Sequence, residues 1–321
     1  MEGPLSPQDN AYDLMRLTPR GDRLFEMISR YDDLLAMEGR QGYEPGDTLA
    51  LIVPFLLLHG IAERNITELA CKATLTQGAR ELLSGLAASG WQIFCITTTY
   101  EQYARHITGI MGIPFERVAC TPFPLDAFAG KLSHDEIELF KHTEQELLSL
   151  NESADDHLIK SALDDFFWTR LPRTPAGEMI RSVKPIGGRR KLQALTGFSE
   201  AHRQPLSKWA VVGDSITDSQ MLGATDQAGG LSVAFNGNQY ALPYATLALA
   251  STHLSDMEPI LNSWREHGRS GVTEELKHVI SPAEKRRNFT WLADGDKDIQ
   301  TVIALHRRLR RLVREKAGEL G

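Results

Sequence analysis

Cysteine is scarce in this sequence. The three cysteines, Cys71, Cys95 and Cys120, lie far apart and form no C-x-x-C pair. A disulfide framework and a cysteine-ligated zinc site are therefore excluded. Their apolar surroundings indicate buried thiols in a reducing compartment.

Long apolar runs and excess positive charge are also missing. The most apolar stretch, residues 49–61, is too short to span a bilayer and is interrupted by Pro54. The first ten residues, MEGPLSPQDN, have no basic region and no apolar run, so we expect no signal peptide and a cytoplasmic location. The formal net charge of −7 argues against a nucleic-acid-binding surface. Nothing in the sequence indicates a protein partner or a homo-oligomer.

What is present is the composition of a globular protein, with 42% hydrophobic residues in a chain of 321. This length suggests about two domains, or one core with large insertions. Short apolar runs alternate with segments of helical periodicity, which predicts an α/β fold with a mostly parallel sheet. The predicted strands are residues 89–100, 117–125, 208–215 and 231–237. From residue 271 onward the chain is expected to be helical.

Polar residues follow three of these apolar runs, in ITTT, GDSITD and AFNGN. Ligands bind beyond the carboxyl ends of the strands in such sheets. We therefore expect these three segments to form one site.

The GDSIT segment at 213–217 resembles the first block of GDSL-type esterases, in which Ser215 would be the nucleophile. That chemistry requires a histidine base held by an aspartate. None of the ten histidines has an aspartate three residues before it, as the family pattern D-x-x-H demands. The esterase interpretation therefore lacks its partners.

A second resemblance extends over most of the chain. VVGDSITDSQML resembles the fourth motif of the HAD (haloacid dehalogenase-like) superfamily of Mg²⁺-dependent hydrolases, and FCITTTYEQ resembles its second motif. VKPIGGRRKLQAL resembles the third, and SVAFNGN and LTQGARELLSGLAASGWQI resemble segments of its phosphoserine-phosphatase-like branch. The resemblance implies that Asp214 binds Mg²⁺ and that Asp218 supports the ion directly or through water. Phosphate would be bound by Thr97, Thr98 and Lys191, with Lys184 as the alternative lysine.

The fold implied by this resemblance is a Rossmannoid three-layer parallel sheet with a helical C1-type cap and a further helical insertion. The core would comprise residues 1–13, 81–130 and 180–270. The cap would be 14–80, the insertion 131–179, and 271–321 a helical tail. Arg20, Arg23 and Arg30 on the cap are candidate contacts for an anionic substrate, although such arginines more often form surface ion pairs.

The nucleophilic aspartate of the first motif is not in this sequence. One branch of the superfamily, which includes proteins named energy-converting hydrogenase subunit R, has D-x-E-G-P there and continues much like DNAYDLMRLTPRGDRLFEMISRYDDLLA. On this resemblance, Met1 is the x and Glu2 the second acid. We therefore expect the codons upstream of Met1 to encode an apolar strand that ends in Asp.

In the complete form, that Asp would attack the phosphorus of a small phosphorylated substrate. Glu2 would act as the acid and base, and Mg²⁺ would be held by the Asp, by Glu2 and by Asp214. The alternative is a non-catalytic binding or scaffold subunit with the same fold. The sequence does not name a substrate, because the cap would select it.

Overall fold

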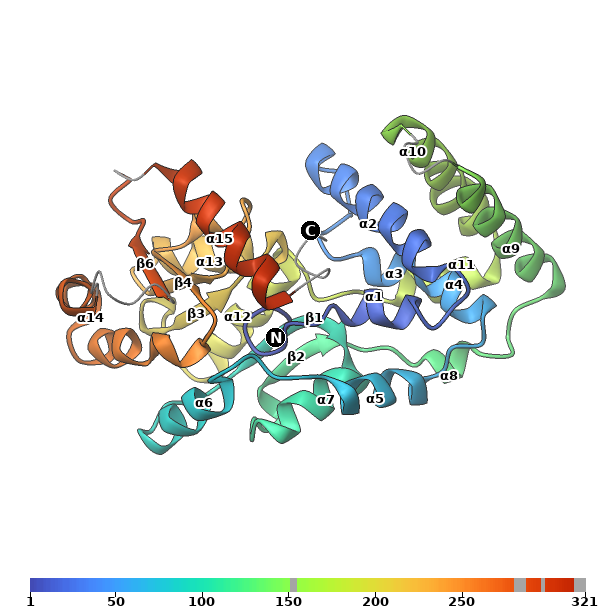
Figure 1. Cartoon of the computed structure of the whole chain (residues 1–321). Coiled ribbons are helices and arrows are strands. Elements are labelled where there is room, and N and C mark those ends of the chain that lie inside the picture. Colours follow the sequence, from blue (N-terminus) through green and yellow to red (C-terminus); the bar gives the residue numbers. More distant parts are fainter. Residues whose placement is uncertain (151–154, 280–286, 296–297, 315–321) are drawn as a thin grey trace.

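The computed structural model describes residues 1–150, 155–279, 287–295 and 298–314. It confirms an α/β fold, in which helices predominate (Figure 1). The strands are β1 (Cys95–Tyr100), β2 (Val118–Thr121), β3 (Ala210–Gly213), β4 (Leu231–Phe235), β5 (Leu247–Ser251) and β6 (Arg287–Trp291). The helices are α1 (Asn10–Met15), α2 (Gly21–Glu38), α3 (Thr48–Leu51), α4 (Val53–Leu58), α5 (Glu63–Lys72), α6 (Ala79–Ala88), α7 (Glu101–Ile110), α8 (Leu125–Phe128), α9 (His134–Ser149), α10 (Asp156–Asp164), α11 (Pro175–Ser182), α12 (Arg189–Ala201), α13 (Ser219–Gln227), α14 (Glu258–Val279) and α15 (Ile299–Arg314).

The described strands form two sheets. β1 pairs with β2 in parallel, and the second sheet has the order β3-β4-β5-β6, in which only β6 is antiparallel to its neighbour. β4 and β5 are buried at every residue, which explains their continuous apolar sequences LSVAF and LALAS. The larger sheet is thus mostly parallel, as expected, but β1 and β2 form a separate sheet among the described residues.

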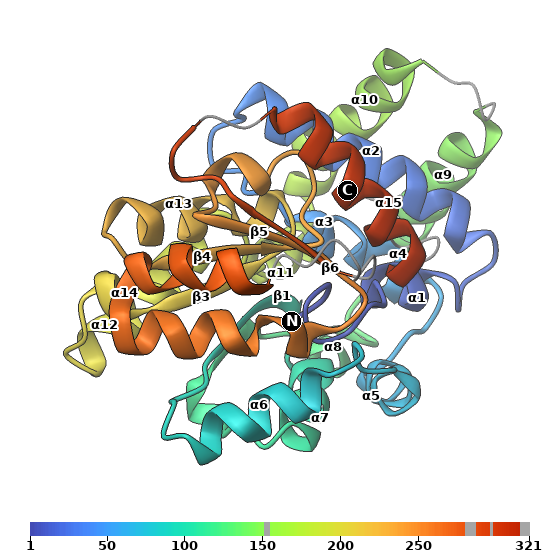
Figure 2. The same cartoon turned by 60° about the vertical axis from the view of Figure 1, so that its left-hand side comes forward.

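Helices cover both faces of the larger sheet. Leu231, Val233 and Leu247 pack against α6 and α14 on one face. On the other face, Ala248 packs with Val302 of α15, and α12 and α13 pack beside β3. Figure 2 shows the strands between α14 on one side and α13 and α15 on the other. This is a three-layer arrangement.

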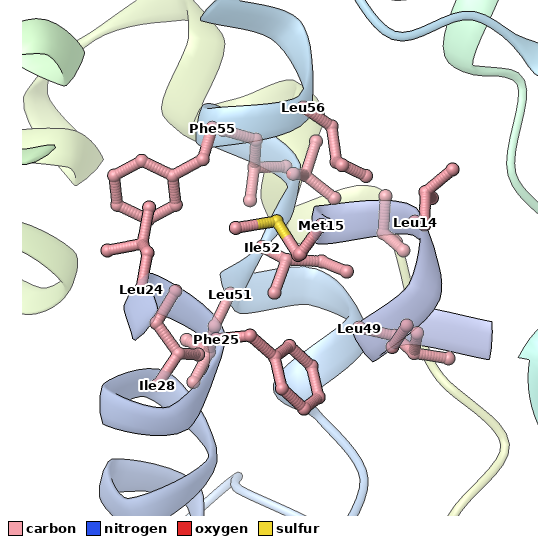
Figure 3. Close-up of a cluster of buried hydrophobic side chains, with 14 of the residues drawn as sticks. Leu14, Met15, Leu24, Phe25, Ile28, Leu49, Leu51, Ile52, Phe55 and Leu56 are labelled. Carbon is pink, nitrogen blue, oxygen red and sulfur yellow. The ribbon is translucent and has the colours of Figure 1, made fainter. Parts of the chain in front are cut away.

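Helices α1–α5, which come before β1, and the helices between β2 and α12 share a single hydrophobic core. That core runs from α1–α5 to α9–α11. Figure 3 shows Met15 of α1 surrounded by apolar side chains of α2, α3 and α4, all of them buried. The segments 14–80 and 131–179, which the sequence suggested as cap and insertion, are therefore packed together.

Ion pairs join this helical region to the core. Glu44 and Asp47, which precede α3, contact Arg189 and Arg190 at the start of α12. The Arg189 backbone N–H also donates to Glu44 Oε2 at 2.9 Å. These contacts hold the helical region against the end of the sheet where α12 begins.

The edges of β1 and β3 that face each other have no strand partner among the described residues. Between them lies an apolar cavity of about 180 Å³, lined by residues 91–96 and 209–212. It extends from Leu86 of α6 in one helical layer to Leu195 and Met221 of α12 and α13 in the other. We call this cavity the interstrand slot.

Two strands of the larger sheet were missed from the sequence. β5 was assigned to no element, and β6 lies in the segment 271–321 that was expected to be wholly helical, an expectation that is wrong there. β6 forms because its residues pair with all five residues of β5, which gives the sheet an antiparallel edge. This pairing cannot be seen in the local periodicity of RNFTW.

In the described residues, no single helix has the length and hydropathy that crossing a bilayer requires. One bent pair, Thr48–Leu58 with Glu63–Lys72, reaches these values only when its two helices are taken together.

Candidate functional site

A second cavity, of about 140 Å³, lies where β1 and β3 end. We call it the strand-end cavity. Its wall contains residues from eight separate parts of the chain, among them Glu2, Asp32, Asp33, Thr97, Thr98, Lys191, Asp214, Arg310 and Arg314. β1 and β3 therefore run in the same direction, with their amino-terminal parts on the interstrand slot and their carboxyl ends on this cavity. Glu2, Thr97, Thr98, Lys191 and Asp214 are residues that the sequence singled out.

Asp218 shapes the turn after β3. Its Oδ2 accepts hydrogen bonds from the backbone N–H groups of Asp214 (2.9 Å) and Ser215 (3.2 Å). Gly213 has no room for a side chain, because a Cβ there would lie 2.5 Å from the Asp218 Cβ. The turn GDSITD thus folds back on itself and directs Asp214 into the cavity.

Lys191 occupies the first turn of α12, and its ammonium is buried. Its Nζ donates to Asp218 Oδ1 at 2.7 Å and to Thr217 Oγ1 at 2.9 Å. Burial alone would raise the pKa of Asp218, but the Lys191 ammonium outweighs it and lowers that pKa below its usual value. Lys184, the alternative lysine, is exposed and does not line the cavity.

Asp218 therefore supports the site and does not line it. Both of its oxygens accept hydrogen bonds from protein donors, one from Lys191 and one from the turn. The carboxylate of Asp218 is thus the partner of Lys191 and of the turn, and its support of Mg²⁺, directly or through water, stays a prediction.

Thr97 and Thr98 come from the β1 end of the sheet. Thr97 is 1% exposed, and its Oγ1 accepts a hydrogen bond from the Thr99 backbone N–H at 3.3 Å. Both threonines line the strand-end cavity opposite Asp214. Two hydroxyl groups are thus available to an anion at this position.

Glu2 and Gly3 bring the N-terminal segment into the site. Glu2 Oε1 accepts a hydrogen bond from the Asn10 backbone N–H at 2.8 Å, at the start of α1. Burial, together with the nearby Asp9, raises the pKa of Glu2 to about 7. A carboxyl with this pKa can gain or lose a proton near neutral pH. Gly3 has φ +84° and lies against the Asp214 carboxylate.

Asp214 itself is held by two arginines of α15. Its Oδ2 accepts hydrogen bonds from Arg310 and, at 3.0 Å, from Arg314. The sequence analysis missed both residues, since α15 was expected to lie in a helical tail outside the core. The sequence does contain a pattern that predicts a buried face on this helix. Val302, His306 and Arg310 recur every four residues and form the buried face of α15.

His306 supports this face in its neutral form. Its Nδ1 accepts a hydrogen bond from the Gly237 backbone N–H at 3.0 Å, and burial lowers its pKa to about 4. A neutral imidazole next to the buried Arg310 adds no further positive charge.

The cap arginines named from the sequence lie elsewhere. Arg20 and Arg23 do not line the cavity, and their guanidinium groups donate to the backbone carbonyls of Leu148 and Leu150 at the end of α9. Arg30 pairs with Asp156 of α10. The expectation that Arg20 and Arg23 bind substrate is therefore wrong for this arrangement, since they join α2 to the neighbouring helices.

α2 instead presents an acidic wall. Asp32 and Asp33 line the cavity, and burial raises the pKa of each. For Asp32, hydrogen bonds from Tyr43 and Thr48 act in the opposite direction, and the pKa is about 7. No feature of the sequence distinguished these two residues from other surface acids.

The residues described here do not by themselves fit Mg²⁺. They contain no group of three or more histidine, cysteine, aspartate or glutamate side chains able to hold a metal ion. On the cavity wall Asp214 is already neutralised by Arg310 and Arg314. A magnesium site usually requires one or two carboxylates that are free to bind the ion, so a further carboxylate would be needed.

Ser215 does not have the partners of a serine nucleophile. Its hydroxyl lies 2.9 Å from Thr217 Oγ1. No histidine is present on the described wall of the cavity. The esterase interpretation therefore gains no support from the geometry.

The chain was compared with known families, curated proteins and solved structures. No protein-family model matches the chain, and no curated protein matches it. Among solved structures, gene product AF1437 from Archaeoglobus fulgidus is similar with a TM-score of 0.87 and 28% sequence identity. The likeness covers 100% of this chain and 97% of that one.

Gly3 provides a test of how tightly the N-terminal segment fits. A Cβ at Gly3 would lie 2.3 Å from Asp214 Cγ, whereas Gly39, with a similarly positive φ of 63°, has nothing within 4 Å. We expect Gly39→Ala to lose about 1 kcal/mol of unfolding free energy from backbone strain alone. Gly3→Ala should lose at least about 2 kcal/mol, because the clash adds to that strain. Urea denaturation measures both, and equal losses would contradict the packing of Gly3 on Asp214.

Asp32 provides a test by pH. Folding raises the pKa of Asp32 from 3.8 to about 7, because burial favours the protonated carboxyl. The free energy of unfolding therefore falls as the pH rises through this range and the buried carboxyl ionises. Asn cannot ionise and avoids this loss. Asp32→Asn should therefore become more stable relative to the wild type between about pH 5 and about pH 8, by on the order of 2 kcal/mol. Urea denaturation at both pH values measures this, and a constant difference would show that Asp32 does not titrate this way.

Proposed function

We propose that this chain forms most of a HAD-like, Mg²⁺-dependent phosphatase for a small phosphorylated metabolite. One further aspartate, directly before Met1, completes the site. The observation that carries the proposal is the convergence of Thr97, Lys191 and Asp214 on one cavity with Glu2. These four residues come from distant parts of the chain and correspond to four separate motifs of the resemblance.

The cavity has donors suited to a phosphoryl group. A lysine ammonium has three N–H donors, and Lys191 uses two of them for Thr217 and Asp218. The third remains for a phosphoryl oxygen, together with the hydroxyl groups of Thr97 and Thr98. Fixed donors around the transferring oxygens are the main requirement of phosphoryl transfer.

The interstrand slot supports the position of the missing aspartate. An extended apolar segment in the slot would lie between the unpaired edges of β1 and β3, parallel to both, with helices on either side. Met1 lines both the slot and the strand-end cavity. The Met1 ammonium contributes to the lowered pKa of Asp218, so it lies near that carboxylate. A residue joined to Met1 would therefore bring its side chain to the same place.

The reaction would proceed in two steps. The added Asp attacks phosphorus, the phosphorus–oxygen bond to the alcohol breaks, and Glu2 donates a proton to the departing oxygen. Water then attacks the aspartyl phosphate, Glu2 accepts the proton of that water, and inorganic phosphate leaves. With the added carboxylate beside Asp214, Mg²⁺ would offset the charge of the phosphoryl oxygens.

A second candidate is a non-catalytic binding subunit. The ion pairs of Asp214 with Arg310 and Arg314 favour it, because they balance the charge of Asp214 without any metal. In that case the cavity binds an anion and performs no chemistry.

Two designed extensions separate these candidates. About five alternating Val and Ile residues, a usual strand length, would be placed before Met1 and followed by Asp in one chain and by Asn in the other. Both extensions should fill the slot and stabilise the chain by up to about 4 kcal/mol. Only the Asp chain should hydrolyse p-nitrophenyl phosphate and a panel of phosphate esters, and only with Mg²⁺.

The outcomes are distinct. If both extended chains are stabilised and neither turns over any ester, the phosphatase proposal fails and the binding subunit is favoured. If neither chain is stabilised, the slot does not accept a strand, and the position given to the aspartate is wrong.

A further inference from the structure

The two arginines of α15 carry more positive charge than their carboxylate partner balances. Arg310 and Arg314 both contact Asp214 and are almost fully buried, with side chains 5% and 8% exposed. The two guanidinium groups thus share the single carboxylate of Asp214, and the Glu2 carboxyl lies near Arg314. Burial, with the nearby Arg314, acts to lower the pKa of Arg310, yet arginine stays protonated in proteins.

Arg310 also has a buried donor without an acceptor. Its Nε is inaccessible to solvent and has no hydrogen-bond partner among the described residues. Buried polar groups are nearly always paired, so an orphaned donor indicates a missing acceptor. A guanidinium offers its N–H groups in a planar fork that matches a carboxylate or phosphate.

Lys191 and the two α15 arginines line the cavity from different helices. Lys191 belongs to α12 and is paired with Asp218, whereas Arg310 and Arg314 belong to α15 and contact Asp214. The α2 wall, with Asp32 and Asp33, is acidic and would repel an anion. Anionic groups can therefore be accommodated at the lysine and at the arginines.

We propose that Arg310 and Arg314 bind a second anionic group of the ligand, in addition to the phosphoryl group at Thr97 and Lys191. The inference rests on the proposed function only for the position of that first group. It defines the substrate class as a phosphate ester with a further phosphate or carboxylate. The second group accepts from N–H groups of the two guanidiniums on the cavity wall, which it shares with Asp214.

Non-hydrolysable probes test this without turnover. Isothermal titration calorimetry of the full chain would compare inorganic phosphate, which has one anionic centre, with methylenediphosphonate and 3-phosphonopropionate, which have two. We expect at least one two-centred probe to bind about tenfold or more tightly than phosphate. Preference for the diphosphonate indicates a second phosphate, and preference for phosphonopropionate indicates a carboxylate.

Three variants test whether Arg310 and Arg314 cause the tighter binding of the two-centred probe. Arg314→Gln and Arg310→Lys, which keeps the charge but removes Nε and the fork, should weaken binding of the two-centred probe by a larger factor than binding of phosphate, and so remove its advantage. Arg308→Gln makes the same charge change as Arg314→Gln at an exposed position of α15 and should change nothing. Thermal denaturation of each variant reports its stability separately.

The inference is overturned if the wild type shows no preference for a two-centred probe. It is equally overturned if Arg310→Lys and Arg314→Gln lower the melting temperature but keep the preference, since the arginines would then only anchor α15. Failure of the phosphatase proposal gives a different result. The Asp-extended chain would then hydrolyse no ester, but it could still prefer the two-centred probe and lose that preference on Arg314→Gln.

Discussion

The buried ion pair between Lys191 and Asp218 is the interaction on which the rest of the site depends. Each side chain is 6% exposed, and removing one partner would leave an unpaired charge at a cost of about 3–5 kcal/mol. Asp218 also holds the turn after β3 through two backbone N–H groups, which directs Asp214 toward Arg310, Arg314 and Gly3. The Asp218 carboxylate thus joins α12 to the end of β3. Through its effect on Asp214 it also connects them to α15 and the N-terminal segment.

The separation of β1 from β3 lowers the stability of the fold, whereas the Lys191–Asp218 pair supports it. The apolar interstrand slot leaves two strand edges without partners, and neither helical layer fills it. The slot and the strand-end cavity meet at Met1, so the place where packing is poorest adjoins the place where charged groups converge. An extended segment in the slot would pair with the two strand edges and fill the poorly packed space. Its last side chain would enter the strand-end cavity, where the charged groups converge.

Much of the site could be predicted from the sequence because short motifs follow apolar strands. Thr97 and Asp214 come directly after buried runs, and the carboxyl ends of parallel strands meet at one edge. Other features depend on contacts between distant segments. β6 forms only by pairing with β5, and Arg310 reaches Asp214 only because α15 packs on the sheet.

The errors have a similar cause. A helical pattern shows that Arg20 lies on an amphipathic helix but not which neighbour that face meets, and here it meets the end of α9. Nor does the motif of Asp218 show that its ion-pair partner is Lys191, 27 residues away in the sequence. Periodicity carries no information about such partners.

A crystal structure of the chain soaked with tungstate, a phosphate analogue located by its anomalous signal, tests the central claim most directly. The claim is that the strand-end cavity binds a phosphoryl group. We expect tungstate within hydrogen-bond distance of Lys191 Nζ and the hydroxyl groups of Thr97 or Thr98. Tungstate bound only elsewhere, or none in this cavity at a concentration that saturates other sites, would contradict the account.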